Sequence, residues 1–370
     1  MQRRRLFPLS LLALAAWVVG GTATGGEEQP RSLLDAAYAK TKTASSIEDF
    51  TGIIALCNQA RAKELPPQLS DYARQLLSWA HNRRGEAYAE QAAKLLDSGE
   101  KGRAGECDAQ ALADFEKAVE LDSTRWKPAH NRGVSHALAG NYDKALADFS
   151  RVIELKPDYA NAWFNRGEIH RELGELRKAV EDYSRAIQLK ADDFGALMGR
   201  GQAWLRLGRG REALEDFHRA VALNPQSAVA HACRGEAHQS LGMWEQAAED
   251  LRNANRLDRT SSRAYQAAAW LMATCPEARF RQTELAVQAA ERAVQLAGSR
   301  DPRYLDTLAA AYANAGRFNE AVATLNKAVA STSDQRHRAA MQSRMQLYKS
   351  GRPYRQNRPA ANTSAASLRP

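Results

Sequence analysis

The sequence predicts an all-α fold, a solenoid of stacked antiparallel helix pairs, from two observations. An Arg-Gly dipeptide occurs at 132–133, 166–167, 200–201 and 234–235, each copy 34 residues after the one before it. Within each period, apolar residues recur at i, i+4 and i+7, the spacing of one face of a helix. Repetition at a fixed interval of about 20–50 residues is typical of units that must stack to bury their apolar faces.

The first 25 residues are predicted to be a signal peptide. Three arginines at 3–5 precede an apolar run over 6–19, and small residues follow up to Glu27. A basic start, a short apolar run and a small-residue exit are typical of secretory signals, whereas a membrane span needs about 18–20 apolar residues. We expect export to the periplasm, the envelope or the medium and no membrane span after cleavage. An uncleaved membrane anchor is the alternative.

Residues 30–77 are predicted to form degenerate helices ahead of the repeats, and residues 78–125 one repeat with an insertion. The helical segments RRGEAYAEQAA (83–93) and ALADFEKAVELD (111–122) lie 14 residues further apart than their equivalents in the later units. The extra residues include DSGEKGRAGE, a composition typical of loops. We therefore expect a loop around 97–107 that is among the least ordered parts of the mature chain.

Residues 126–261 are predicted to form four regular units, each a helix–turn–helix hairpin of 34 residues. When the recurring glycine is numbered position 8, the units begin at Trp126, Ala160, Phe194 and Ala228. A second glycine at position 15 ends the first helix through a left-handed turn. Small residues at positions 8 and 20 let the two helices approach closely. Position 24, inside the predicted second helix, holds Phe149, Tyr183, Phe217 and Leu251.

Four further segments are predicted after the regular units. Residues 262–301 form a unit with five extra residues around TCPEARFRQ, and residues 302–335 form the last unit. Residues 336–351 are predicted to be a capping helix. Residues 352–370 lack apolar periodicity and are basic, so they are predicted to be a disordered tail.

The arginine at position 7 is predicted to form an ion pair with an aspartate on the second helix of its own hairpin. The aspartate follows 16 residues later in every regular unit, and the two residue types appear and disappear together in the flanking units. The aspartate of a neighbouring unit is the second choice of partner. The predicted pairs are Arg84–Asp114, Arg132–Asp148, Arg166–Asp182, Arg200–Asp216 and Arg234–Asp250. The arginine is therefore interpreted as architectural.

Charge gives no indication of a nucleic-acid partner. The chain holds 52 Lys/Arg and 43 Asp/Glu, but the excess is concentrated in the signal and in residues 331–370, which leaves about −1 for residues 27–330. A near-neutral body lacks the basic footprint of a nucleic-acid-binding protein. We expect no nucleic acid among the partners.

No catalytic, cofactor or metal site is predicted. The sequence contains no GxSxG, HExxH or P-loop motif. Its four cysteines have no CxxC spacing and are interpreted as packing thiols. His136, His170 and His238 share position 11, but equivalent positions of stacked helices lie about 8–10 Å apart, so these histidines are interpreted as packing residues. The protein is predicted not to be an enzyme.

The units resemble the tetratricopeptide repeat family, with the strongest motifs in residues 126–261 and weaker ones across 78–330. The resemblance implies a right-handed superhelix whose first helices line a concave groove, and a scaffold that binds a protein or peptide segment there. Some members grip a C-terminal carboxylate with Lys and Asn at positions 5 and 9. This chain has neither residue there, so that class of ligand is not expected.

By the same resemblance, the partner groove is expected at positions 2, 5, 9 and 12 of the first helices. The groove residues are Lys127, His130, Asn161, Phe164, Glu168, Arg171, Met198, Gln202, Leu205, Glu236, Arg263 and Trp270. Phe164, Met198 and Leu205 are expected to form an apolar centre with charged residues at its edge. The alternative function is an envelope adaptor whose basic tail contacts an anionic polymer or surface.

Overall fold

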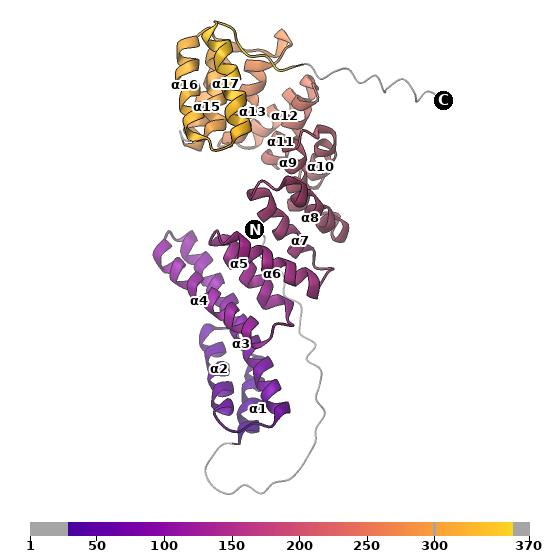
Figure 1. The fold of residues 1–370 in the computed structure, drawn as a ribbon, viewed down its shortest axis with the longest axis vertical. Coiled ribbons are helices and arrows are strands. Elements are labelled where there is room, and N and C mark those ends of the chain that lie inside the picture. Colours follow the sequence, from indigo (N-terminus) through magenta and orange to yellow (C-terminus); the bar gives the residue numbers. More distant parts are fainter. Residues whose placement is uncertain (1–28, 299–300, 358–370) are drawn as a thin grey trace, which may run out of the picture.

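The computed structural model describes residues 29–298 and 301–357, and its α-helices follow one another along the chain without a strand in these ranges (Figure 1). The helices are α1 (Pro30–Thr41), α2 (Ile47–Arg61), α3 (Pro67–Asp97), α4 (Lys101–Leu121), α5 (Trp126–Leu138), α6 (Tyr142–Leu155), α7 (Ala160–Glu172), α8 (Leu176–Leu189), α9 (Phe194–Arg206), α10 (Gly210–Leu223), α11 (Ala228–Ser240), α12 (Trp244–Leu257), α13 (Ser262–Thr274), α14 (Thr283–Ala297), α15 (Pro302–Asn314), α16 (Phe318–Ser331) and α17 (Gln335–Lys349), with a short 3-10 helix at Ala278–Phe280. The chain is a solenoid of stacked helix pairs, as predicted.

The predicted signal peptide and residues 358–370 of the predicted tail lie outside the described residues. Within the described ranges, no helix combines the length and the apolar character needed to cross a membrane.

Glycines at positions 15 and 8 make each regular hairpin. Gly140, Gly174, Gly208 and Gly242 have φ between +71° and +78°, the left-handed conformation that ends the first helix. Position 8 provides close helix contact: a Cβ on Gly201 would lie 2.6 Å from Cε1 of Phe217 on the paired helix. The aromatic rings at position 24 fill the space that these glycines leave, and they are buried.

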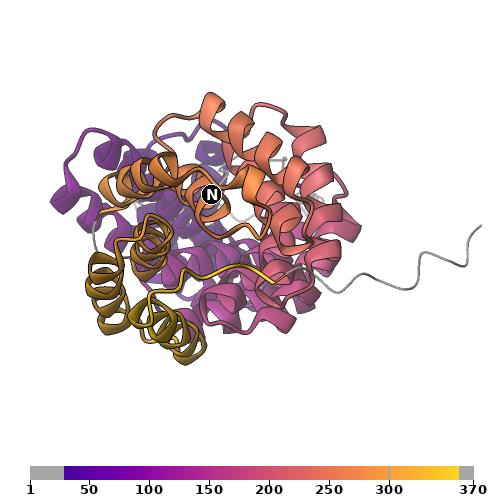
Figure 2. The same ribbon diagram turned by 90° about the horizontal axis from the view of Figure 1, so that it is seen from above.

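The first helices of the repeats lie on the inner side of the curved stack. Contacts join α7 with α9, α11 with α13 and α13 with α15, whereas the consecutive second helices α6, α8, α10 and α12 share fewer contacts with one another. Helices on the inside of a curve lie closer together than those on the outside. Seen from above, the hairpins turn around a central axis (Figure 2).

The N-terminal part differs from the expectation. The predicted boundary between residues 77 and 78 falls inside α3, one continuous helix of 31 residues. The first half of α3 packs on α1 and α2, where Leu76 and Leu77 join the buried cluster of Leu34 and Ile53. A single helix therefore serves both the N-terminal hairpin and the first repeat.

The predicted loop around 97–107 is wrong, because the inserted residues extend both helices of the first repeat. α3 continues to Asp97, Gly99 turns the chain with φ +83°, and α4 begins at Lys101. Ala92 and Ala104, one on each helix of this extension, are buried. A composition rich in Gly and charge still forms helix when a paired helix buries one of its faces.

The predicted disordered tail also needs correction at its start. Residues 352–357 leave α17 as an extended segment, and Pro353–Gln356 are half-buried against α13 and α15. The tail prediction therefore remains only for residues 358–370.

Candidate functional site

The five predicted ion pairs are confirmed. Each arginine donates from Nε and Nη2 to both carboxylate oxygens of the aspartate on its own hairpin, as in Arg166 Nε–Asp182 Oδ2 at 2.9 Å and Nη2–Oδ1 at 2.7 Å. The four sibling pairs, with closest distances of 2.6–2.8 Å, are Arg84–Asp114, Arg132–Asp148, Arg200–Asp216 and Arg234–Asp250. The five aspartates are only 2–4% exposed. Two-point pairing of this kind fixes the angle between the helices as well as their distance.

Two of these arginines also link their hairpin to the one before it, which sequence reasoning missed. Nη1 of Arg166 donates to Ser150 Oγ and Nη1 of Arg200 to Ser184 Oγ, both at 3.0 Å. These serines occupy position 25 of the preceding unit, so the signal was a small hydroxyl residue recurring two positions after the aspartate. Arg166 and Arg200 therefore also set the stacking of their hairpins on the preceding ones.

Asp250 is the most heavily bonded of these carboxylates. It accepts from Arg234 and lies 3.1 Å from His231 Nδ1 and 3.0 Å from His238 Nδ1. Burial alone would raise the pKa of Asp250, but hydrogen bonds from His238, Arg234 and His231 outweigh burial and hold the pKa well below 3.8. The carboxylate stays charged and joins α11 to α12.

Two of the three histidines at position 11 contact carboxylates of their own hairpins, whereas Nδ1 of His136 is buried without a hydrogen-bond partner. His170 Nδ1 lies 2.6 Å from Glu175 Oε2, and His238 Nδ1 contacts Asp250. No group of three or more His, Cys, Asp or Glu side chains in the described part of the chain is placed to hold a metal ion. The four cysteines are free thiols, and burial raises the pKa of Cys57 and Cys233 to about 12.

Met198 was predicted at the open centre of the groove, and this prediction is wrong. Its side chain is only 6% exposed and belongs to the buried cluster that includes Tyr183 and Leu197. Phe164 is half-buried, with its ring centroid 6.0 Å from that of Tyr183. Helical spacing placed both residues on the inner side, but the following first helix covers that stripe because the repeats stack closely.

His130 is likewise part of the packing rather than of an open groove. Its ring lies 5.8 Å from Phe149 and 5.1 Å from Tyr159, and Nδ1 is buried without a hydrogen-bond partner. Burial lowers the pKa of His130 to about 4. The side chain is therefore neutral near pH 7 and acts as an aromatic packing residue.

The charges predicted on α7, α11 and α13 at the edge of the groove are paired within the chain. Glu168 accepts hydrogen bonds from Arg171 and from the Tyr183 hydroxyl. Arg263 donates to both oxygens of Glu236 at 2.8 and 2.7 Å, and the charge of Glu236 raises the pKa of Arg263 despite burial. Arg263 and Glu236 therefore join the first helices α13 and α11, whereas Glu168 pairs with Arg171 within α7 and with Tyr183 of α8.

Trp270 lies under other residues of the chain. The Tyr354 ring centroid is 5.9 Å away, and the Arg344 guanidinium lies 5.5 Å from the Trp270 ring. Arg344 also forms a buried ion pair with Asp306 on α15, with Nη2–Oδ2 at 2.6 Å. The C-terminal end of the inner face is therefore filled by α17 and by the segment that follows it.

Four further predicted groove residues keep part of their surface open to solvent on α5, α7 and α9, although Leu205 also packs against the buried cluster of Tyr183 and Leu197. Asn161 is exposed, and Lys127, Gln202 and Leu205 are half-buried. Gln202 makes only a long contact, 3.7 Å from Nε2 to Cys233 Sγ. Val229 on α11 adds an apolar side chain that is 45% exposed. We call these five residues the open inner face.

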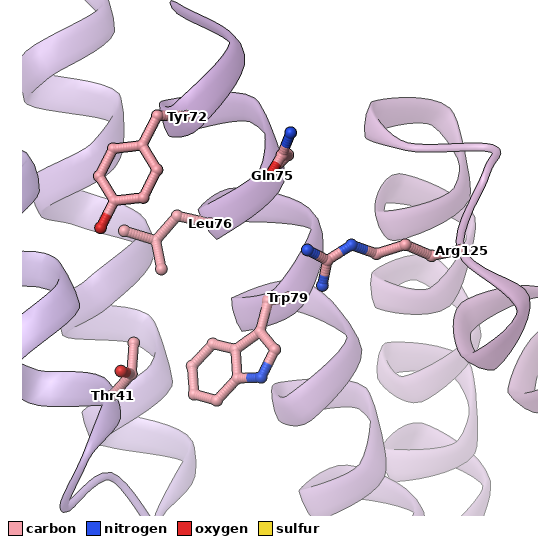
Figure 3. A pocket seen from close by; sticks show the side chains of 6 residues that line it. All are labelled: Thr41, Tyr72, Gln75, Leu76, Trp79 and Arg125. Atoms are coloured by element: carbon pink, nitrogen blue, oxygen red, sulfur yellow. The ribbon is translucent and has the colours of Figure 1, made fainter. Parts of the chain in front are cut away.

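Two pockets among the described residues were considered, and neither resembles a ligand site. The first lies between Tyr72, Leu76 and Trp79 of α3, with Thr41 and Arg125 at its edge, and has room for about one water molecule (Figure 3). The second lies around Arg132, His136 and Asp148, where the side chains already form the ion pair described above.

Comparison with known families supports the repeat assignment. Models of the family described as tetratricopeptide repeat match residues 130–194, 171–228 and 302–335. These matches support the tetratricopeptide repeat family for the central units and for the last hairpin. No curated protein matches the chain.

A solved structure supports the same fold. A tetratricopeptide repeat protein from Parabacteroides merdae ATCC 43184 is 15% identical over 72% of this chain and 98% of its own, with a TM-score of 0.50. YrrB, described as a TPR protein with an unusual peptide-binding site, is 17% identical over 62% of this chain and 97% of its own, with a TM-score of 0.39. MamA from Desulfovibrio magneticus RS-1 is 19% identical over 48% of this chain and 96% of its own, with a TM-score of 0.41.

Proposed function

We propose that this protein is a non-catalytic scaffold that binds an extended or helical segment of a partner protein on the open inner face. Proteins built from these repeats are generally interaction scaffolds rather than enzymes. The single observation that supports the site is the 45% exposed Val229 near the half-buried Leu205, on a face where the neighbouring charges of α7, α11 and α13 are already paired.

The chemistry of the open inner face favours a partner with apolar anchors and few charges. Leu205 and Val229 offer apolar contact, while Asn161 and Gln202 offer amide groups that suit a peptide backbone. Lys127 provides a positive charge at the α5 end, with its Nζ 5.6 Å from the Trp126 ring. The neighbouring pair Arg263–Glu236 contributes no net charge.

The location of this activity is part of the proposal. The arginines at 3–5 and the apolar run over 6–19 support export through a cleaved signal peptide. N-terminal sequencing of the protein from its native host tests this step, since an export signal predicts a mature N-terminus within a few residues of position 25.

A matched pair of leucines tests the partner site. Peptides selected from a random display library on the full-length protein would be titrated against Leu205→Glu and Leu223→Glu. Leu223, 46% exposed at the end of the second helix α10, is the control on another face. Central anchors contribute about 2 kcal/mol or more, so Leu205→Glu should weaken binding roughly 30-fold, while Leu223→Glu leaves it unchanged.

Two other results would contradict the site. If Leu205→Glu and Leu223→Glu lost the same peptide affinity while their thermal melts stayed unchanged, the peptide would not bind specifically on the inner face. Loss of binding on deletion of residues 358–370 alone would assign the contact to the basic tail.

A further inference from the structure

α13 ends differently from the first helices of the regular units. Those helices end at a left-handed glycine, and the turn returns backbone N–H groups to the last carbonyls, as from Glu175 N to His170 O. In the unit of α13, the position of that glycine is Pro276, and the C-cap residue Cys275 is extended with φ −56° and ψ 132°. Proline has no N–H to donate, so the last carbonyls of α13 need donors from elsewhere.

The insertion after α13 supplies some of these donors. The backbone N–H of Gln282 donates to the Met272 carbonyl at 3.2 Å. Nη1 of Arg281 donates to the carbonyls of Cys275 and Pro276 at 2.8 and 3.0 Å. The carbonyls of Ala273 and Thr274, which lie between these in sequence, receive nothing from the insertion.

The segment after α17 supplies the remaining donors. Nη1 of Arg355 donates to the Ala273 carbonyl at 2.9 Å, and the backbone N–H of Gln356 donates to the Thr274 carbonyl at 2.8 Å. Both donors lie 82 residues further along the chain than their acceptors. The negative end of the α13 dipole also favours a cation such as the Arg355 guanidinium at this place.

Side chains add recognition to these backbone contacts. Nη2 of Arg355 donates to Asn314 Oδ1 on α15 at 2.9 Å, and Nε2 of Gln356 donates to Thr274 Oγ1 at 2.7 Å. Burial lowers the pKa of Arg355, and the nearby charge of Arg281 lowers it further, so these hydrogen bonds hold a desolvated guanidinium. The partners of Arg355 and Gln356 therefore match the functional groups of both side chains.

Tyr354 adds an aromatic anchor. Its ring lies on one side of the Arg344 guanidinium, 5.5 Å from ring centroid to Cζ, and Trp270 lies at the same distance from that guanidinium. Residues 353–356 are half-buried, whereas Arg352 and Asn357 on either side are exposed. Contact is thus confined to four residues of an extended chain, which is how a docked peptide behaves.

We propose that Trp270, Ala273, Thr274, Asn314 and Arg344 form a peptide-binding site, called here the α13 site, and that its occupant is this chain's own segment Pro353–Gln356. The site takes an extended peptide that carries an aromatic residue followed by an arginine and a glutamine. This inference does not depend on the partner site proposed for α5–α11. It makes the C-terminal end of the inner face a separate site that the chain itself keeps closed.

Hydrogen exchange in the full chain tests docking in cis. The Gln356 amide donates a hydrogen bond to the Thr274 carbonyl. Its hydrogen should therefore exchange at least about ten times more slowly than that of the exposed Asn357 amide. Tyr354→Ala should remove that protection, and Arg352→Ala, a change of an exposed neighbour, should leave it unchanged. Unprotected Gln356 in the wild-type protein would overturn the proposal.

Binding in trans tests the site itself. The probe is a fluorescein-labelled peptide with the sequence of residues 350–357, SGRPYRQN, and the receptor is the full chain with Tyr354→Ala and Arg355→Ala. We call this double variant the released variant. A tethered segment has an effective concentration of about 1 mM and competes with the free peptide. For a peptide that binds the released variant with a Kd of about 100 μM, this competition should weaken binding to the wild-type protein roughly tenfold.

Two controls make the result decisive. The same peptide with alanine in place of its tyrosine and arginine should not bind, and circular dichroism should show an unchanged helix content in the released variant. Equal binding by wild-type and released protein, or no binding by a folded released variant, would overturn the proposal.

Discussion

Arg166 and Asp182 allow the architectural role of the repeated arginine to be tested quantitatively. Asp182 is 4% exposed, and its carboxylate has only His170 Nε2, at 3.8 Å, besides the arginine. Arg166→Ala therefore leaves a buried carboxylate almost unpaired. We expect the free energy of unfolding to fall by about 3–5 kcal/mol, the usual cost of breaking a buried pair from one side.

The reverse substitution should cost less. The Arg166 side chain is 21% exposed, and its Nη1 keeps the hydrogen bond to Ser150 when Asp182 is changed to alanine. Water can therefore solvate part of the remaining charge. We expect a loss of about 2–3 kcal/mol, between the values for surface and buried pairs. Replacing both residues, with Arg166→Met and Asp182→Leu, should cost less than Arg166→Ala alone because no charge stays buried.

The assay combines urea denaturation, followed by circular dichroism, with hydrogen exchange of the α7 and α8 amides. Exchange is needed because repeat arrays often unfold in parts, so a global transition underestimates a local loss. Arg151→Ala is the matched control, since Arg151 pairs with Glu154 at 2.9 Å on the exposed face of α6. Its loss should cost less than about 1 kcal/mol. If Arg166→Ala and Asp182→Ala also lowered the free energy of unfolding by less than about 1 kcal/mol, the architectural role of this ion pair would be refuted.

Three further predictions concern packing, pH and metal ions. Gly201→Ala should destabilise the fold by about 1–3 kcal/mol, since its Cβ would meet Phe217, whereas Gly102→Ala, with nothing within 4 Å, should stabilise it slightly in urea titrations. The pKa of His130 is lowered to about 4, so its contribution to stability is complete above pH 6.5 and is lost as the pH falls toward 4. His130→Phe should therefore flatten the decline of Tm across this range, and an unchanged decline would contradict the assignment. Added zinc should leave the Tm unchanged in a thermal-shift assay, because no three metal-ligating side chains lie together in the described part of the chain, and a clear rise would contradict this.

The sequence predicted the repeat and the ion pairs because both depend on short-range spacing. A 34-residue period specifies one hairpin, and the 16-residue interval from Arg166 to Asp182 specifies which faces of its two helices meet. The left-handed glycines, such as Gly174, occur at the predicted ends of the first helices for the same local reason.

The inner face was less predictable because it depends on how closely neighbouring hairpins stack. Helical spacing places Met198 on the inner side, but only the position of the following hairpin decides that the residue is buried. Trp270 is a similar case, since Tyr354 and Arg344 cover it from segments far along the chain. The helical form of the insertion at 97–107 depended on burial between α3 and α4, which composition does not report.

Photo-crosslinking tests the proposed scaffold function most directly. A photoreactive phenylalanine analogue would replace Leu205 on the open inner face or, in a second protein, Leu223 on α10, and cross-linked peptides from the native host fraction would be identified by mass spectrometry. The account predicts that position 205 cross-links to a defined segment of one partner, that position 223 does not, and that excess unlabelled wild-type protein abolishes the product. Equal cross-linking from both positions, or none from position 205 while binding persists, would contradict the proposal that the inner face holds the partner.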